Sequence, residues 1–324
     1  MMEEKNFDEF TPVNLELLRL GKIPGFDLYI ASPNGPVLYR QNDIEFTQEN
    51  LEALLDNDVK YLYFKNDEEE LYFEYIEKNL THIITDNNVP IIKKATVVYD
   101  TSAYLARQML AEPESEGVVK RASDVLDKII TFTSHDDSTY KNIIQILPTD
   151  YYTHTHCANV ATYSLALGRE IGLTVDTGLW ELTLGALLHD VGKAKVPPEI
   201  LQKIKPLNVL EVSIIKKHVE WGMDIVKNTS VVPYKSYPAI AQHHERLDGS
   251  GYPAGTTDIN LFGKVVAVAD AFDAMTTNRP YARAKSSFYA VSVLKSRHDE
   301  YDQSIVKALV EVMAGRINKI EAKV

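Results

Sequence analysis

The first eighty residues alternate between short apolar runs and turn-forming residues. Two apolar runs, at 26–31 and 36–41, flank the dipeptide Asn34-Gly35. This dipeptide is typical of tight hairpin turns because both residues tolerate positive φ angles. The pattern therefore predicts a β-hairpin near the start of the chain.

The pattern then changes to a mixture of helical and strand spacing. Residues 47–56 begin with Thr47 as a helix N-cap and continue with helical periodicity. Residues 59–65 are predicted as a further strand, and residues 67–80 as a helix with acids in its first turn. Together these elements predict a small α/β module at residues 1–82, without a recognisable catalytic constellation.

Apolar positions in the predicted helical connector, residues 83–147, form a stripe at helical spacing. The segment AEPESEG at 111–117 predicts a break just before that stripe. The stripe either packs on the helices that follow or forms a two-helix dimer contact, and the pattern does not choose between them. Its members are Val118, Val119, Ala122, Val125, Leu126, Ile129 and Ile130.

Two stretches near the end of the chain have the same periodicity. We expect them to form helices that complete a bundle with the preceding ones. They carry Phe288, Val291 and Leu294, and then Ile305, Leu309, Val310 and Met313.

Histidine and aspartate recur through the second half of the chain without a cysteine at similar spacing. Successive members lie roughly 25 to 33 residues apart, about the length of a helix, a turn and the start of the next helix. Each helix would return one ligand to the same place, so converging helices are predicted. Imidazoles and carboxylates suit a hard or borderline divalent metal better than a structural zinc site. The candidates are His156, His189, Asp190, His218, His243, His244 and Asp270.

Four of these candidates form two adjacent pairs, His189 with Asp190 and His243 with His244. Neighbouring side chains on a regular helix point about 100° apart. Both members reach one cluster only at a helix end or between two metals. Gly192 and Gly249 follow the pairs closely and would permit such endings.

The surrounding motifs occur in a distinctive order. After a histidine at 156 come HDVGK at 189–193, a lone histidine at 218, HHERLDGSGYP at 243–253 and DAFDAMTTNRPY at 270–281. This order resembles the HD-GYP branch of the HD phosphohydrolases, which are bacterial phosphodiesterases acting on cyclic di-GMP. The resemblance covers roughly residues 150–315.

For this chain the resemblance implies an all-α HD-type helical bundle at residues 148–324. It also implies a two-metal centre made by the seven candidates above, with Asp190 as the bridging carboxylate. Iron is the implied metal, with manganese as the alternative. The complete fold class is then a two-domain α+β protein, with the helical bundle preceded by the small α/β module.

A metal pair suits phosphodiester hydrolysis because it activates water and stabilises charge on the phosphoryl oxygens. Lys193 stands one helical turn after Asp190, where its ammonium would contact the phosphate or protonate the leaving oxygen. Its alternative role is to oppose a helix dipole. Arg279 offers a forked contact for a phosphate or a guanine edge, and Asp273 is expected to contact substrate or Arg279.

The loop at 248–255, DGSGYPAG, combines turn formers with one aromatic residue. Glycines such as Gly251 would let backbone amides approach an anion. Tyr252 would lie against a purine or close over the phosphate. The alternative is a plain surface turn.

Two positions depart from the family pattern. Tyr152 stands where relatives with three metals typically carry Glu, so two metals and a linear dinucleotide product are expected. Ala282 stands where many members carry a basic residue that holds the dinucleotide. The second departure keeps alternatives open: a nucleotide receptor with slow or no turnover, or a hydrolase of another cyclic nucleotide.

Composition adds limits. The 324 residues carry a net charge of −12, which argues against binding to polymeric nucleic acid or to an anionic membrane. The single cysteine, Cys157, excludes an intrachain disulfide and suits a reducing cytoplasm. The family resemblance implies cyclic di-GMP as a partner, and a signalling protein such as a diguanylate cyclase is a further candidate, with a sensory or partner-binding role for the N-terminal module. A packing or homodimer role for that module is the alternative.

Overall fold

The computed structural model describes residues 7–134, 139–148, 152–279 and 283–320. The chain divides into two compact units, one ending at Val97 and the other beginning at Val98. The division falls within a single helix, α3 (Ile91–Ala111). The three-part division expected from the sequence, with boundaries after residues 82 and 147, stays a prediction.

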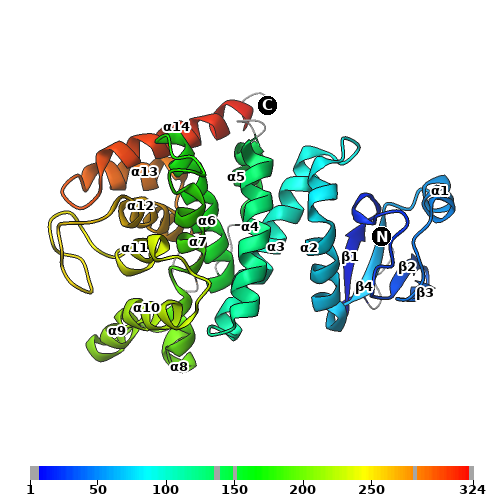
Figure 1. Cartoon of the computed structure of the whole chain (residues 1–324), viewed down its shortest axis with the longest axis horizontal. Coiled ribbons are helices and arrows are strands. Elements are labelled where there is room, and N and C mark those ends of the chain that lie inside the picture. Colours follow the sequence, from blue (N-terminus) through cyan, green and yellow to red (C-terminus); the bar gives the residue numbers. More distant parts are fainter. Residues whose placement is uncertain (1–6, 135–138, 149–151, 280–282, 321–324) are drawn as a thin grey trace. The chain divides into compact units, whose positions relative to one another are not determined.

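The N-terminal unit contains an antiparallel sheet with the strand order β1-β4-β2-β3 (Figure 1). Strands β2 and β3 form the predicted hairpin, with Ser32 paired to Gly35. Thr47 caps α1 as expected, and its hydroxyl accepts a hydrogen bond from the Asn50 amide. The elements are β1 (Phe10–Asn14), β2 (Leu28–Ser32), β3 (Gly35–Arg40), α1 (Gln48–Asp56), β4 (Tyr61–Lys65) and α2 (Glu69–Thr85).

Aromatic side chains join α2 to the sheet. Phe26 is fully buried, and its ring meets Phe64 of β4 and both Tyr72 and Tyr75 of α2 with centroids 5.5 to 5.8 Å apart. The Phe64 and Tyr72 rings stack at 4.6 Å. Such contacts add to the free energy of burying the rings. The core of this unit is therefore largely aromatic and aliphatic.

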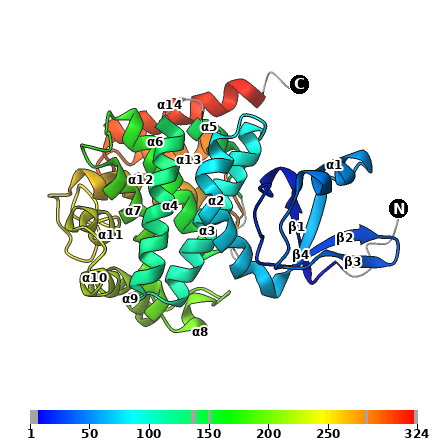
Figure 2. The ribbon, with the colours of Figure 1, turned by 45° about the vertical axis from the view of Figure 1, so that its right-hand side comes forward.

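The C-terminal unit is a bundle of helices, which Figure 2 shows from a second side. Helices α6 and α7 lie next to one another, and α12 packs on α6. After α3, its elements are α4 (Glu116–Ser134), α5 (Thr139–Ile146), α6 (Thr153–Glu170), α7 (Leu179–Leu188), η3 (Val191–Lys195), α8 (Pro198–Leu201), α9 (Val209–Lys216), α10 (His218–Asn228), η4 (Tyr234–Ser236), α11 (Tyr237–Ala241), α12 (Leu261–Thr276), α13 (Ser287–Ser296) and α14 (Gln303–Ile320).

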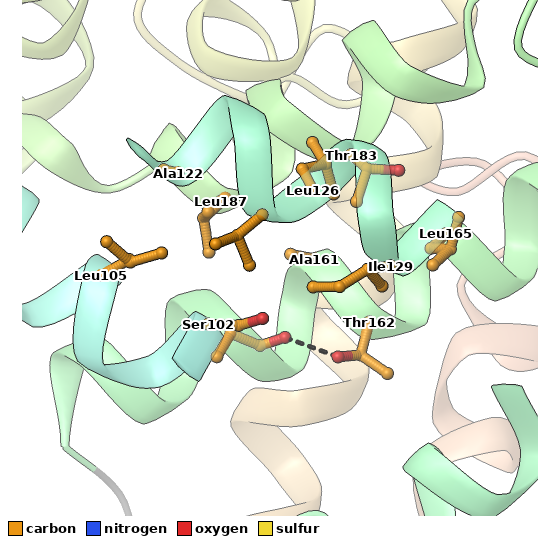
Figure 3. Close-up of a pocket in the computed structure, with 12 residues that line it drawn as sticks. Ser102, Leu105, Ala122, Leu126, Ile129, Ala161, Thr162, Leu165, Thr183 and Leu187 are labelled. Carbon is orange, nitrogen blue, oxygen red and sulfur yellow. Dashed lines mark hydrogen bonds between the residues drawn. The ribbon is translucent and has the colours of Figure 1, made fainter. Parts of the chain in front are cut away.

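The apolar stripe of α4 packs inside this unit. All seven of its predicted members are buried. Figure 3 shows Leu126 and Ile129 of α4 with Leu105 of α3, Ala161 of α6 and Leu187 of α7 around a cavity of about 30 Å³. The stripe thus serves the core of the bundle, which resolves the choice left open by the sequence.

One expected core residue lies elsewhere. Leu294 of α13 is fully buried, but Phe288 at the start of the same helix is 82% exposed. The expectation that both share a packed face is wrong because Phe288 lies in the first turn, beyond the neighbouring helices. No helix in the described part of the chain combines the length and apolarity needed to span a membrane.

Candidate metal centre

The predicted ligands come from widely separated helices of the C-terminal unit. His156 lies in α6, His218 opens α10, and Asp270 lies in α12. The pair His189 and Asp190 sits between the end of α7 and the start of η3. The pair at 243 and 244 follows the end of α11. Both pairs therefore occur at helix ends, where adjacent side chains can turn to the same cluster.

The rings of three candidate histidines are oriented by the same kind of local hydrogen bond. The Nδ1 atoms of His189, His218 and His243 lie 2.7 to 2.8 Å from the carbonyl oxygen three residues earlier in each case. A carbonyl can only accept, so each Nδ1 carries the proton and donates it. The Nε2 atom of each ring is then an unprotonated electron-pair donor facing the cluster.

The ligand atoms gather in two groups. One comprises Asp190, His218, His243 and His244, and the other comprises His156, His189 and Asp270. In each group the candidate ligand atoms lie within 4.8 Å of one another. All seven predicted ligands thus meet at one place in the bundle.

Asp190 lies between the two groups. Its Oδ1 atom is 3.2 Å from His218 Nε2. Its Oδ2 atom is 3.5 Å from His156 Nε2 and 3.4 Å from His189 Nε2. The two oxygens of one carboxylate therefore face opposite groups.

The donor atoms fit divalent cations better than they fit one another. The Nε2 atoms of His218 and His243 are 3.3 Å apart, although the tautomers set by their Nδ1 atoms leave both without a proton. Asp190 Oδ1 and His189 Nε2 are buried and make no hydrogen bond within the described residues. Buried polar atoms normally have partners, because an unpaired one costs free energy. A cation bound among them would supply the missing partner.

Burial and charge set the protonation states that ligation needs. Burial alone would raise the pKa of Asp190, but the nearby Lys193 and His189 hold it well below its usual range. Burial lowers the pKa of His244 to about 3. Burial also lowers the pKa of His218. The carboxylate is therefore ionised and these imidazoles are neutral at neutral pH, as metal ligands must be.

Lys193 and Gly192 lie in the 3-10 helix that follows Asp190. The Lys193 ammonium forms an ion pair with Asp190 Oδ2. A Cβ atom on Gly192 would come within 1.9 Å of the His218 carbonyl oxygen. Gly192 therefore allows η3 to lie against α10. This close approach, and not the helix ending expected from the sequence, explains the glycine.

Asp273 lies behind the cluster. It has no exposed surface, and its Oδ2 atom accepts from Nδ1 of His156 at 2.7 Å. The sequence placed Asp273 in contact with substrate or with Arg279. In the structure the enclosed side chain faces a candidate ligand histidine, and the expected contact with substrate or Arg279 stays a prediction.

The loop after His244 supports an aromatic ring beside the cluster. Tyr252 stacks on the His244 ring at 4.6 Å, and the Lys216 ammonium lies 4.6 Å from the centre of the Tyr252 ring. The Tyr252 amide donates to the His244 carbonyl. A Cβ atom on Gly251 would meet the backbone of residues 244–246 at 2.5 Å. Gly251 thus lets the loop fold back on residues 244–246. The substrate-binding roles of Gly251 and Tyr252 stay predictions.

Glu245 is a site-forming residue that the sequence reasoning missed. It is 2% exposed, and its carboxylate accepts from the amides of Ala254 and Thr256 at 2.7 and 3.1 Å. These amides are therefore engaged within the protein and are not available to cradle an anion. The sequence feature that could have pointed to Glu245 is its place as a charged residue directly after two candidate ligands, His243 and His244.

The remaining predicted positions are Arg279, Ala282 and Tyr152. Arg279 is half-buried beyond the end of α12. Ala282, the departure noted in the sequence, lies outside the described residues. Tyr152 is 63% exposed, and its ring stacks on His154. Neither Tyr152 nor His154 belongs to the two ligand groups.

A likeness in fold extends over most of the chain. The structure of Bd1817, described as an HDG"Y"P protein from Bdellovibrio bacteriovorus, aligns with a TM-score of 0.67 and 24% identity. The alignment covers 94% of this chain and 99% of that one. It supports the fold, including an N-terminal unit before the helical bundle.

Curated proteins resemble part of this chain. The cyclic di-GMP phosphodiesterase PA4108 of Pseudomonas aeruginosa is 30% identical over 194 residues, which cover 59% of this chain and 47% of that protein. The 3'3'-cGAMP-specific phosphodiesterase 3 of Vibrio cholerae is 32% identical over 166 residues, covering 50% of this chain and 35% of that protein. The chain thus spans half or less of the length of these relatives.

A family model described as an HD domain matches residues 140–305. The match includes every predicted metal ligand. The resemblance inferred from the order of the sequence motifs is thereby confirmed, and the chain belongs to the HD domain family.

Proposed function

We propose that this protein hydrolyses cyclic di-GMP to a linear dinucleotide at a two-metal centre. The observation that carries the proposal is the Asp190 carboxylate, whose two oxygens face two separate groups of histidine and aspartate ligands. Iron, or manganese as the alternative, would be held there by the seven residues. Such a pair supplies an activated water and stabilises charge on a phosphoryl group.

The chain's own residues would orient the substrate. The Lys193 ammonium stands beside Asp190, in reach of a phosphate placed over the two groups. Its expected role is to stabilise charge on the phosphate or to donate a proton to the leaving oxygen. Tyr252, which stacks on His244, presents an aromatic face next to the same place. Arg279 is proposed to contact a phosphate or a guanine edge.

A second substrate is favoured by a specific observation. The relatives include 3'3'-cGAMP-specific phosphodiesterases as well as cyclic di-GMP phosphodiesterases. The two dinucleotides share the phosphodiester ring and differ in one purine, so the same metal ligands would serve both. Residues that contact the bases decide between them.

Turnover measurements test the proposal. Protein loaded with ferrous iron without oxygen, or with Mn²⁺, is incubated separately with cyclic di-GMP and 3'3'-cGAMP, and products are separated by chromatography. We expect cyclic di-GMP to be consumed faster, with the linear dinucleotide as the early product. Faster consumption of 3'3'-cGAMP would make 3'3'-cGAMP the preferred substrate in place of cyclic di-GMP. Tight binding without consumption under either metal would show a receptor.

Lys193→Ala separates rate from binding. If Lys193 assists the leaving group, kcat should fall by about 10²-fold or more while KM changes little. Lys195→Ala is the matched control, since Lys195 is on the same 3-10 helix but pairs with Glu114. A change in KM alone for Lys193→Ala would contradict the catalytic role.

A further inference from the structure

His156 differs from three of the other candidate histidines, His189, His218 and His243, in how its outer nitrogen is held. His189, His218 and His243 lie at helix ends, where the carbonyl three residues earlier is available to each Nδ1. His156 lies inside the first turns of α6, and its Nδ1 donates instead to a carboxylate on another helix, Asp273 of α12. The orientation of His156 therefore depends on a side chain.

Asp273 is itself held by two further residues. Its Oδ1 atom accepts from the Asn159 amide nitrogen at 2.8 Å. The Asn159 carbonyl oxygen accepts from the Tyr99 hydroxyl at 2.9 Å. Tyr99, Asn159, Asp273 and His156 are all buried, with exposed fractions of 6% or less. They form one continuous chain of hydrogen bonds from α3 through α6 and α12 to the metal centre.

The donors and acceptors in this chain have a single consistent order. An ionised Asp273 can only accept, so the Asn159 nitrogen must face it and the Asn159 oxygen must face Tyr99. The Tyr99 hydroxyl must then donate. Burial raises the pKa of Tyr99 well above its usual range, so the hydroxyl keeps its proton. Removing that hydroxyl would leave the buried Asn159 oxygen without this donor.

We propose that Tyr99 and Asn159 are positioning residues, which fix Asp273 and through it the ring of His156 for binding one of the two metals. The inference rests on the two-metal centre of the proposed function but not on hydrolysis. The effect should fall on one metal because of how the ligands are grouped. The chain of hydrogen bonds supports His156, which lies in the group with His189 and Asp270, whereas His218 and His243 of the other group rely on backbone carbonyls.

Tyr99→Phe tests the proposal because it removes the hydroxyl and keeps the ring. Metal affinity is measured by titrating apoprotein with Mn²⁺ in competition with a chelator, and bound metal is counted by elemental analysis. We expect one of the two ions to bind about tenfold more weakly and the other to be unchanged, as outer-shell changes at metal sites usually have effects of this size. Tyr75→Phe is the matched control, since Tyr75 is a buried tyrosine of the N-terminal unit whose hydroxyl also makes one hydrogen bond.

A double-mutant cycle tests whether Tyr99 acts through Asp273. Asp273→Asn alone should weaken the same ion by about tenfold to a hundredfold. Adding Tyr99→Phe should then have little further effect, because coupled residues are not additive. Equal weakening of both ions, unchanged affinity in Tyr99→Phe, or full additivity would overturn the positioning role. Wild-type protein that binds fewer than two ions would contradict the two-metal proposal itself, so the two failures are distinguishable.

Discussion

The two units of this protein treat ionisable groups in opposite ways. In the described part of the N-terminal unit, tyrosines apart, the buried polar or charged residues are Asn79 and Lys94. Residues 1–97 nevertheless carry nineteen acidic and nine basic residues, which lie mostly at the surface. The C-terminal unit instead encloses histidines and carboxylates within a few ångströms of one another.

This difference shows that the requirements of stability and of function conflict where polar groups are buried. Burying a charged or polar group without a partner costs free energy, so a domain optimised only for stability avoids it. The N-terminal unit mostly follows that rule with its aromatic core, with one buried carboxylate oxygen, on Glu68, that has no hydrogen-bond partner among the described residues. The C-terminal unit departs from it most clearly at the ligand cluster, which is the expected location of chemistry.

Asp190→Asn is expected to have the largest effect on this contrast. It removes the negative charge shared by the two ligand groups, so bound metal should fall and hydrolysis should become undetectable while the helices remain folded. Elemental analysis measures the bound metal, and circular dichroism measures whether the helices remain folded. Asp299→Asn, on an exposed aspartate, is the control. Unchanged metal content in Asp190→Asn would exclude Asp190 as a ligand.

Phe26→Ala should destabilise the N-terminal unit. Loss of a fully buried ring that meets three other aromatic rings is expected to cost about 3 to 5 kcal/mol. We expect the N-terminal unit to melt at a lower temperature while metal content stays the same. Phe288→Ala, at an 82% exposed position, should change neither. A parallel loss of metal in Phe26→Ala would show that the units are not independent.

Gly192→Ala tests the close packing next to the metal centre. The added methyl group would overlap the backbone of α10 at His218, so we expect a loss of about 3 kcal/mol and weaker metal binding. Gly117→Ala, near the start of α4, has its nearest contact at 3.8 Å and should be neutral or slightly stabilising. Denaturant unfolding compares the two. Equal stability of both variants would contradict the steric argument.

Arg279→Ala should have the smallest effect of the four, and on substrate alone. Loss of a charged, forked contact is expected to cost about 1.5 to 3 kcal/mol, or roughly a tenfold to hundredfold weaker binding of cyclic di-GMP. Metal content should not change. Arg297→Ala, on an exposed arginine that pairs with Glu300, is the control for calorimetric titration. Unaltered affinity in Arg279→Ala would remove Arg279 from the substrate site.

The sequence could single out the seven candidate ligands because they are histidines and aspartates that recur at similar intervals, and their role as metal ligands stays a prediction. All seven candidates meet in the structure. The local elements of the hairpin and of the α1 cap were equally accessible, since short-range turn and capping signals determine them.

What the sequence did not predict depends on contacts between distant segments. Strand β1 contains Pro12 and lacks alternation, and it becomes a strand by pairing with β4 more than fifty residues later. Asp273 follows Asp270 by one helical turn, which suggested a shared role. Whether its side chain faces substrate or a histidine is decided by the packing of α12 on α6. Neither fact is encoded in local spacing.

The unequal support of the histidines also bears on how such a protein can change during evolution. A backbone carbonyl cannot be removed by substitution, so the outer hydrogen bonds of His189, His218 and His243 persist whatever mutations accumulate around them. The outer hydrogen bond of His156 goes to a side chain, and a single nucleotide change can abolish it. Selection can therefore change the support of His156 through side chains, whereas the outer hydrogen bonds of the other three histidines come from the backbone.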